Sequence, residues 1–230
     1  MDRWIPIESN PEVFNSWVNA AGLVKSEAQF SDIYGLDSEL LAMVPQPVHA
    51  VILLFPLTKE MEEKRRGEEA KFASDTPPPV DPGVIYIKQT IGNACGTMGM
   101  LHAVLNSGVP LVPDSALAKF HSECKGKTPE ERATLLETTP LFANIHASAA
   151  ASGQTAVPDN LDTELHFTSF VQRPGLNSMR LIELDGDMPA GPVDRGECTD
   201  LLEGVAKFVK DYYVSQSSSV EFSMMALGRP

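Results

Sequence analysis

A predicted β-hairpin in the C-terminal third of the chain constrains the fold more than any other feature. Residues 165–173 and residues 178–185 each alternate apolar and polar side chains, a pattern typical of half-buried strands. Between them, Pro-Gly-Leu-Asn at residues 174–177 supplies turn-forming residues. Strands joined by so short a connection run antiparallel, because parallel strands need a longer crossover. We therefore expect an antiparallel sheet in this fold.

Helices and strands are interspersed along the rest of the chain without regular βαβ spacing. Apolar periodicity and helix-start signals predict helices over residues 11–22, 38–44, 57–72, 93–107, 129–138, 140–150 and 199–213, and strands over residues 49–55, 84–88 and 220–227. This order predicts an α+β fold with one domain over residues 1–230, in which helices flank a central, mostly antiparallel sheet.

Three polar segments lie between the apolar ones. Residues 57–72 mix both charge signs, which predicts a solvated helix face and not a binding patch. Residues 74–83 contain four prolines, which remove backbone donors, so we expect an exposed loop there. Residues 147–162 are small, polar and rich in helix breakers, and a loop of this length commonly has a function.

Charge and cysteine content argue against several classes of protein. The chain has 31 acidic and 18 basic side chains, and its net charge of −13 repels phosphate backbones and anionic lipid. We therefore expect neither nucleic acid nor a membrane as a partner. The first residues lack the apolar core of a signal peptide. Three widely separated cysteines do not suggest a disulfide framework, which favours a soluble monomer in the cytosol or nucleus.

The turn before the predicted helix at residues 93–107 contains a candidate nucleophile. If Asn93 caps this helix, Cys95 falls in its first turn, where free N–H groups and the helix dipole favour a thiolate. The amide of Gln89 and the backbone N–H of Cys95 can hold the oxyanion of a tetrahedral intermediate. A structural role for Cys95 as a small core residue is the alternative.

Two glycines lie inside the same predicted helix. Gly96 and Gly99 each cost about 1 kcal/mol relative to alanine in a helix interior. Another group must therefore approach this helix face closely. A substrate backbone and the tight packing of a neighbouring element both fit this requirement.

The nucleophile needs a base, and the histidines differ in their suitability. His102 shares a helix face with Cys95 but lies about 10.5 Å further along the axis, beyond hydrogen-bond reach. Three others are not favoured. His49 lies in an apolar strand, His121 in a polar stretch and His146 near the start of the long loop.

His166 is favoured because an acid faces it across the predicted hairpin. Pairing Arg173 with Ser178 and counting outward places His166 directly opposite Asp185. The Cβ atoms of cross-strand partners lie about 4.5–5.5 Å apart, so Asp185 can accept a hydrogen bond from the imidazole. Such a bond fixes the ring tautomer and stabilises the imidazolium. The pattern thus predicts a Cys-His-Asp triad.

A metal site is the competing use of these residue types. His121 and Cys124 form one half-site, but no second closely spaced pair completes four zinc ligands. We therefore expect no metal and no cofactor. Cys124 and Cys198 are interpreted as bystander thiols in polar surroundings.

The motifs QTIGNACGT (residues 89–97), LHF (residues 165–167) and ELDG (residues 183–186) follow one another in this order. With them, the chain resembles the short, single-domain ubiquitin carboxyl-terminal hydrolases. The resemblance runs through nearly the whole chain and includes WIPIE at 4–8, NPEV at 10–13, DIYGLD at 32–37, MVP at 43–45 and LLFP at 53–56.

The resemblance implies a thiol-dependent deubiquitinase with a papain-like arrangement and a knotted backbone. Cys95 would be the nucleophile, His166 the general base and acid, Asp185 its orienter and Gln89 the oxyanion donor. The substrate would be ubiquitin or a related modifier, joined through its terminal glycine to small adducts, short peptides or disordered tails, and the intermediate would be a thioester.

The resemblance also assigns residues 147–162 to a crossover loop above the active site. Ala147, Gly153 and Asp162 would then lie near the substrate, and bulky folded leaving groups would react poorly. Glu8 and Asp32 are candidates for pairing with arginines of the ubiquitin tail.

Two positions depart from the family pattern. Asp187 stands where a basic residue is usual, and Arg195 stands where histidine is common, so contacts beside the ubiquitin tail are expected to differ. Two alternatives remain: a module that binds and retains free ubiquitin with little turnover, and a Cys-His-Asp acyltransferase of another substrate class, such as a transglutaminase-like enzyme.

Overall fold

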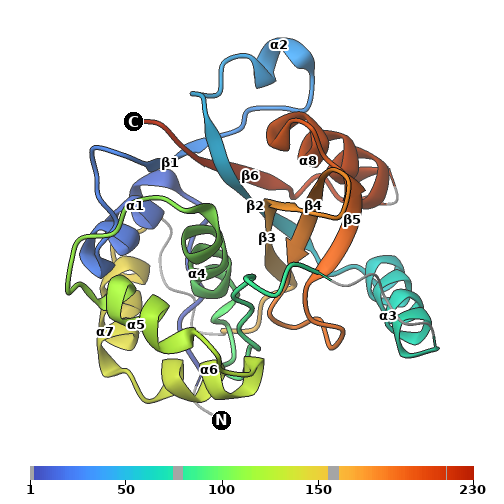
Figure 1. Ribbon diagram of the computed structural model, residues 1–230. Helices are drawn as coiled ribbons and strands as arrows, with labels where there is room; N and C mark the ends of the chain where they lie inside the picture. The colour runs from blue at the N-terminus through green and yellow to red at the C-terminus, as the bar shows by residue number, and fades with distance from the viewer. Residues whose placement is uncertain (1–2, 75–79, 155–160, 216) are drawn as a thin grey trace.

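The computed structural model describes residues 3–74, 80–154, 161–215 and 217–230, whose strands form a six-stranded sheet (Figure 1). The strand order is β1-β6-β2-β3-β4-β5, and every neighbouring pair is antiparallel. The bounds are β1 (Gln29–Asp32), β2 (Val48–Pro56), β3 (Leu165–Pro174), β4 (Met179–Leu184), β5 (Val193–Glu197) and β6 (Ser223–Gly228). The predicted antiparallel sheet is confirmed.

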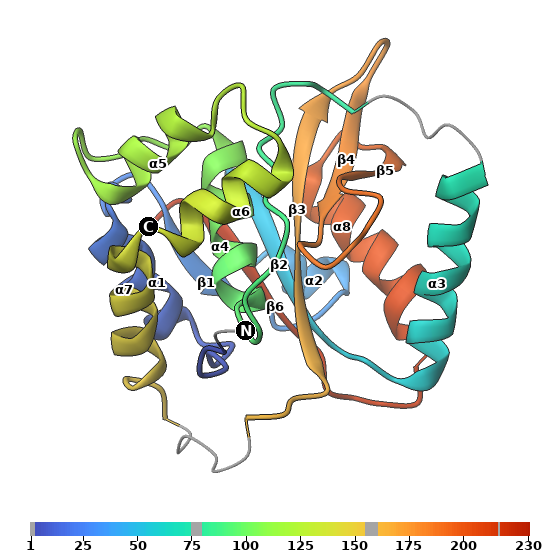
Figure 2. The ribbon, with the colours of Figure 1, turned by 90° about the horizontal axis from the view of Figure 1, so that it is seen from below.

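Helices cover both faces of the sheet (Figure 2). One face carries α1 (Pro11–Ala21), α4 (Cys95–Ser107), α5 (Ala116–Cys124), α6 (Pro129–Glu137) and α7 (Pro140–Ala150). The other carries α2 (Ser38–Leu41), α3 (Lys59–Ser74) and α8 (Leu201–Val209), which continues into the π-helical turn η1 (Lys210–Val214). Residues of β2 alternate between the two cores, as a central strand covered on both faces requires: Ala50 and Ile52 enter one, and Val51, Leu53 and Phe55 the other.

Helix ends follow the capping signals in the sequence. The Asn10 side chain accepts a hydrogen bond of 2.8 Å from the backbone N–H of Glu12, and Gly22 ends α1 in the left-handed region with φ 116°. At α6, Thr128 and Glu131 form a reciprocal capping box. These local bonds explain why the predicted bounds of α1 and α6 lie within a residue of the observed ones.

The predicted hairpin forms, but its register differs from the prediction by two residues. Arg173 pairs with Arg180 and not with Ser178. Strand β3 runs one residue further toward the turn than predicted and β4 begins one residue later, and the backbone N–H of Gly175 donates to the carbonyl of Ser178 at 2.8 Å. Gly175 thus faces Ser178, and Leu176 and Asn177 lie between them at the tip of the hairpin. An even displacement leaves each side chain on its predicted face, whereas an odd one would reverse the faces.

The predicted strand at residues 84–88 is wrong. The segment is extended, but among the described residues it pairs with no strand. Side chains of α4 bind its backbone instead: Asn106 pairs with both polar groups of Ile85 at 2.8 Å, and His102 accepts from the N–H of Ile87 at 2.9 Å. Buried backbone groups need partners, and side chains supply them here as a neighbouring strand would.

The elements that the pattern misses are short. Strands β1 and β5, of four and five residues, form the two edges of the sheet, and α5 was also not predicted. Too few residues carry the periodicity in such elements for it to be recognised. Within the described ranges, no helix has the length and apolar content needed to cross a bilayer.

Candidate active site

Cys95 is the first residue of α4 and lies in its first turn, as predicted. Asn93, however, does not cap the helix. It adopts φ 61°, a left-handed conformation that asparagine tolerates, and Ala94 occupies the N-cap position without a side-chain bond. The Asn93 amide donates instead to the carbonyls of Trp4 at 3.1 Å and Leu161 at 2.9 Å. It thereby ties the turn that carries Cys95 to two distant segments.

His166 lies near the start of β3, and its Nε2 is 2.7 Å from Oδ1 of Asp185. The two residues are only 5% and 2% exposed. Because Ser169 pairs with Leu184, the residue opposite Asp185 is Thr168. His166 lies two residues before Thr168 on the same face, so its imidazole reaches the carboxylate as a diagonal neighbour. The predicted contact forms because the two-residue displacement keeps His166 and Asp185 on one face.

The Cys95 thiol also acts on the imidazole of His166, as one of the groups that raise its pKa. Because Asp185 occupies Nε2, Nδ1 is the nitrogen left for the sulfur. Burial on its own lowers the pKa of His166, but the charge and hydrogen bond of Asp185, together with Cys95, raise it well above its usual value. The ring therefore favours the imidazolium form, the partner that a nucleophilic thiolate requires.

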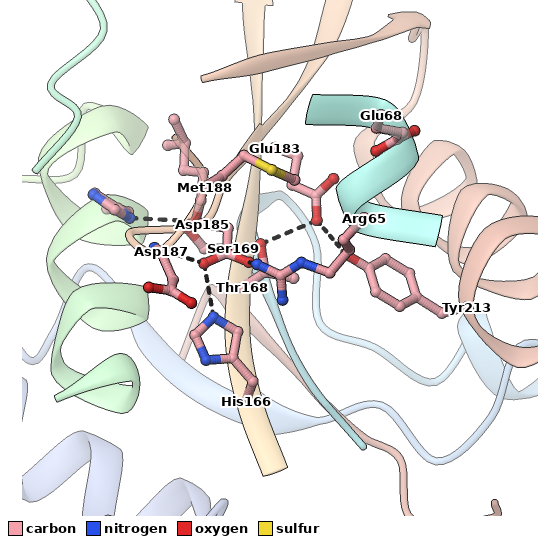
Figure 3. Close-up of polar contacts among 12 residues, drawn as sticks. Arg65, Glu68, His166, Thr168, Ser169, Glu183, Asp185, Asp187, Met188 and Tyr213 are labelled. Carbon is pink, nitrogen blue, oxygen red and sulfur yellow. Dashed lines mark hydrogen bonds and ion pairs between the residues drawn. The ribbon is translucent and has the colours of Figure 1, made fainter. Parts of the chain in front are cut away.

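The carboxylate of Asp185 has a donor on each oxygen (Figure 3). Oδ1 accepts from His166 and from the backbone N–H of Asp187 at 2.9 Å, and Oδ2 accepts from Arg65 at 2.6 Å. The hydroxyl of Tyr86 donates to the backbone carbonyl of Asp185 at 2.8 Å. Burial on its own raises the pKa of Asp185, but His166, Arg65 and the backbone donor lower it below its usual value. The acid is held ionised, and we call His166, Asp185 and Arg65 the Asp185 cluster.

Arg65 is a site residue that the sequence interpretation missed. The prediction of a solvated face is wrong for one side of α3, where Met61, Lys64, Arg65 and Glu68 recur at helical spacing and turn toward the body. Arg65 is 7% exposed, and Lys64 donates to the Tyr212 carbonyl at 2.7 Å. The i, i+3, i+4, i+7 spacing was visible, but three of the four residues are charged, so an apolar pattern could not reveal it.

A second set of buried charges lies beside the first, and we call it the Glu183 cluster. Glu183 precedes Asp185 by two residues, accepts from Arg195 Nε at 2.6 Å, and accepts from the hydroxyl of Tyr213. Arg195 also pairs with both carboxylate oxygens of Glu68, at 2.8 and 3.1 Å. Arg195 is therefore part of this cluster and does not line the pocket beside Cys95.

Packing requires a glycine at residue 96 of α4 but not at residue 99, where the prediction of a close approach is wrong. A Cβ at Gly96 would overlap the Ile7 side chain and crowd Phe167 at 3.3 Å. A Cβ at Gly99 would lie 3.5 Å from Ile52, at ordinary contact distance. The sequence left a substrate backbone and tight packing as explanations for a close approach to this helix. At Gly96 the explanation is packing, because the groups that approach are side chains of this chain.

Gln89 is tied to the same loop as the triad acid. Its backbone N–H donates at 2.8 Å to the carbonyl of Gly186, the residue after Asp185. Its side-chain Oε1 is buried and has no hydrogen-bond partner among the described residues. This orphan atom is an acceptor, whereas an oxyanion needs a donor, so the role of Gln89 as the oxyanion donor stays a prediction that would use its Nε2 group.

Cys95 lines a pocket of about 570 Å³. Its wall contains the N-terminal residues Ile5–Ser9, residues of β2 and β3 that include Phe167, and the segment 221–223. Glu8, Ala150, Asp162 and Thr163 also line it. The pocket is therefore bounded by both described ends of the segment predicted as a loop.

The predicted loop over residues 147–162 is shorter than expected at its start. Ala147 lies within α7, and residues 155–160 lie outside the described part of the chain. Gly153 packs beside Glu8, whose Oε2 accepts from the backbone N–H of Gln154 at 2.8 Å. Asp32 lies on β1 and lines a different hollow, which also includes Tyr34. Burial raises the pKa of Asp32.

The other histidines and thiols have structural environments. His146 contacts Thr97 at 2.8 Å and the Ile5 carbonyl at 2.7 Å, and burial lowers its pKa. Cys124 and Cys198 are buried, contrary to the expectation of polar surroundings, and burial raises the pKa of each to about 11. No group of three or more metal-ligating side chains occurs in the ranges that the structure describes.

Comparison with known proteins gives consistent matches. A family model described as ubiquitin carboxyl-terminal hydrolase, family 1, matches residues 4–213. Ubiquitin carboxyl-terminal hydrolase 3 of Arabidopsis thaliana is 38% identical over 235 residues, covering 99% of this chain and 94% of that protein. Ubiquitin carboxyl-terminal hydrolase isozyme L1 of Homo sapiens is 37% identical over 226 residues, covering 96% of each.

Solved structures share the fold. The catalytic domain of Trichinella spiralis UCH37, solved bound to ubiquitin vinyl methyl ester, superposes with a TM-score of 0.74 at 23% identity. That match covers 100% of this chain and 97% of the other. The papain-like α+β arrangement expected from the sequence is thereby confirmed.

Proposed function

The chain belongs to the ubiquitin carboxyl-terminal hydrolase family, a family of cysteine-type deubiquitinating hydrolases, and we propose that it releases small or extended leaving groups from the C-terminal glycine of ubiquitin. The observation that carries the proposal is the imidazole of His166, which bonds Asp185 at 2.7 Å and interacts with Cys95 at the wall of the pocket.

The reaction follows from these contacts. The Cys95 sulfur attacks the carbonyl carbon of the terminal glycine, and the electron pair of the C=O bond moves to oxygen. The Gln89 amide and the Cys95 backbone N–H hold this oxyanion. As the C–N bond breaks, the His166 imidazolium gives its proton to the leaving nitrogen, and a thioester remains.

Hydrolysis of the thioester uses the same groups in reverse roles. The now neutral imidazole of His166 takes a proton from water, which attacks the thioester carbon. The C–S bond breaks to give the Cys95 thiolate and the carboxylic acid of ubiquitin, which loses its remaining proton to solvent and leaves as the carboxylate. Asp185 stays ionised throughout, because its two oxygens are held by donors, and it keeps the imidazole in one tautomer.

The boundaries of the pocket support a limit on the leaving group. Ala150 on one side and Asp162 and Thr163 on the other are joined by covalently continuous chain. The described ends of this segment flank the pocket, which supports the proposal that a leaving group beside Cys95 has to pass between them. Small adducts, short peptides and disordered tails can do so, whereas a folded domain cannot without a rearrangement.

Charge supports a basic substrate tail. The chain carries a net charge of −13, and Glu8 lies in the wall of the pocket. We assign Glu8 to pairing with an arginine of the ubiquitin tail. Asp32 lines a separate hollow, so we assign it to a more distant part of ubiquitin. Pairs at such half-exposed positions contribute only about 0–1 kcal/mol each.

The test compares turnover across leaving groups of increasing size. Ubiquitin is joined at its C terminus to a fluorophore, to a disordered peptide and to a folded domain, and initial rates are measured with wild type and with Cys95→Ala. We expect loss of about 10⁴-fold or more in Cys95→Ala. Cys124→Ala, which removes a buried thiol remote from the triad, is the matched control and should retain its turnover.

Three outcomes separate the hypotheses. Release of the folded domain as fast as the fluorophore would contradict the limit on leaving groups. Negligible turnover by wild type, together with tight ubiquitin binding that survives Cys95→Ala, would support a retaining module. Transfer to amines without any dependence on ubiquitin would point to an acyltransferase.

A further inference from the structure

We propose that Arg65 is a positioning residue of this reaction. It holds the Asp185 carboxylate in the orientation that bonds His166, and its positive charge lowers the pH up to which the His166 imidazole keeps its proton. The inference rests on the proposed function and adds a residue from α3, a helix whose sequence predicts only a solvated surface.

The geometry divides the two carboxylate oxygens between two tasks. Oδ1 faces His166 Nε2 at 2.7 Å and the N–H of Asp187 at 2.9 Å. Oδ2 faces the Arg65 guanidinium at 2.6 Å, and no other residue that the structure describes donates to it. The side chains of Arg65 and Asp185 are 8% and 2% exposed, so water is a poor substitute for this donor. Without Arg65, a charged oxygen would lie buried and unpaired.

Arg65 is itself fixed on several sides. Its guanidinium lies 5.6 Å from the centre of the Phe55 ring, and that ring meets the His166 imidazole edge-on at 5.6 Å and 83°. Tyr213, Glu183 and Asp187 act on its charge in addition to Asp185. Figure 3 shows Arg65 between Asp185 and Tyr213. A side chain held this way can set the angle of the carboxylate that it bonds.

The charge of Arg65 acts on the imidazole through Asp185. The groups that face His166 are Asp185 and Cys95. Those that face Asp185 are His166, Arg65 and Asp187, and Tyr86, His102 and Tyr213 also interact with its charge. Arg65 is the permanent cation in this set, because arginine keeps its proton over the whole working range of pH. Removing it leaves the imidazole in a more negative potential, so the ring should keep its proton to higher pH.

The experiment measures pH profiles of kcat/KM and kcat on a fluorogenic C-terminal ubiquitin amide for wild type, Arg65→Gln and Arg65→Lys. For Arg65→Gln we expect the alkaline limb to move upward by roughly one pH unit. We also expect kcat at the optimum to fall about tenfold, because the acid is less well aligned. KM should change by less than about twofold, since Arg65 does not line the pocket.

Glu68→Gln is the matched control. Glu68 lies on the same side of α3, three residues beyond Arg65, and its ion pair is with Arg195 instead of Asp185. Its loss weakens the docking of α3 without touching the Asp185 cluster, so its alkaline limb should coincide with that of wild type. A limb that moves equally in both variants would show a merely structural role and overturn the proposal.

Arg65→Lys keeps the charge and provides the second test. Its alkaline limb should stay within about 0.3 pH unit of wild type, while kcat falls because an ammonium fixes a carboxylate less well than a guanidinium. An upward shift equal to that of Arg65→Gln would contradict the charge argument. An unchanged or downward-shifted limb in Arg65→Gln, confirmed as folded by near-UV circular dichroism, would do the same.

The pH dependence of Cys95 alkylation by iodoacetamide separates this inference from the proposed function, because alkylation reports the sulfur and imidazole without ubiquitin. If wild type fails to hydrolyse any ubiquitin substrate, the proposed function fails. The alkylation profiles of wild type and Arg65→Gln still decide the role of Arg65. Profiles that superimpose would refute it, and profiles displaced upward in the variant would support it.

Discussion

Two buried charge clusters lie on one face of the β3–β4 hairpin, and they differ in the partner of the acid. In the Asp185 cluster, the carboxylate is shared between Arg65 and His166, and His166 also interacts with Cys95 at the pocket. In the Glu183 cluster, Glu183 and Glu68 share Arg195, and tyrosine hydroxyls complete the set. Both clusters pair every charge inside a region of low dielectric.

On the proposed function, the difference separates a catalytic acid from a structural one. Arginine keeps its proton at all working pH values, so an acid bonded only to arginine and hydroxyl groups can fix elements but cannot take part in proton transfer. Histidine can lose its proton near neutrality, so an acid bonded to it can tune a base. The hairpin thus carries a reactive pair and an inert one only two residues apart.

The largest expected effect comes from neutralising the acid of the reactive pair. Asp185→Asn should lower kcat by about 10⁴-fold, because the amide stabilises the wrong tautomer of His166 and no longer stabilises the imidazolium. Initial rates on a ubiquitin C-terminal amide, corrected for the folded fraction, measure this.

The neighbouring acid provides the comparison. Glu183→Gln changes the same charge by the same chemistry two residues away, and kcat of the folded enzyme should stay within about threefold of wild type. Should Glu183→Gln lower kcat by more than about 100-fold, the division into a reactive and an inert cluster would be wrong.

The next effect concerns stability. Arg195→Met removes the cation shared by Glu183 and Glu68 and leaves two largely buried carboxylates unpaired, which should lower the free energy of unfolding by about 3–5 kcal/mol. Urea unfolding followed by tryptophan fluorescence measures the loss. Turnover per folded molecule should be unchanged. A loss below about 1 kcal/mol would mean that the cluster contributes little to stability.

Much of the reactive site could be predicted because its signals are local or nearly so. Cys95 at a helix start follows from the turn before α4. The contact of His166 with Asp185 follows from alternation in two strands joined by a short turn, and it survives the two-residue error in register because the face is preserved. Capping bonds likewise place α1 and α6 from a few residues each.

The rest depends on contacts between segments far apart in the sequence. Arg65 lies 120 residues before Asp185, and nothing in its charged surroundings distinguishes it from a solvated side chain. The extended segment at residues 84–88 looks like a strand because it is apolar, yet Asn106 and His102 supply its partners. Asparagine commonly caps helices, but Asn93 adopts a left-handed conformation, and its amide donates to the carbonyls of Trp4 and Leu161 instead.

The smallest predicted effect is the pH dependence of stability contributed by the reactive pair. The pKa of Asp185 is lowered in the folded state, so its contribution is present above its unfolded value and is lost as pH falls from about 4 to about 2. The pKa of His166 is raised, so its contribution is complete below its unfolded value and is lost as pH rises through the folded value.

The difference in unfolding free energy between wild type and Asp185→Asn isolates this term, because the other acidic groups titrate in both proteins. We expect the difference to be largest between about pH 4 and pH 6.5 and to fall on either side, by on the order of 2 kcal/mol on the acidic side. Urea unfolding in buffers from pH 2.5 to 9 measures it. Asp185→Asn removes the shift of Asp185 and the part of the His166 shift that Asp185 causes. A difference that stays constant across this range would therefore show that Asp185 and His166 are not coupled in the folded protein, and the distinction between the two clusters would then rest on geometry alone.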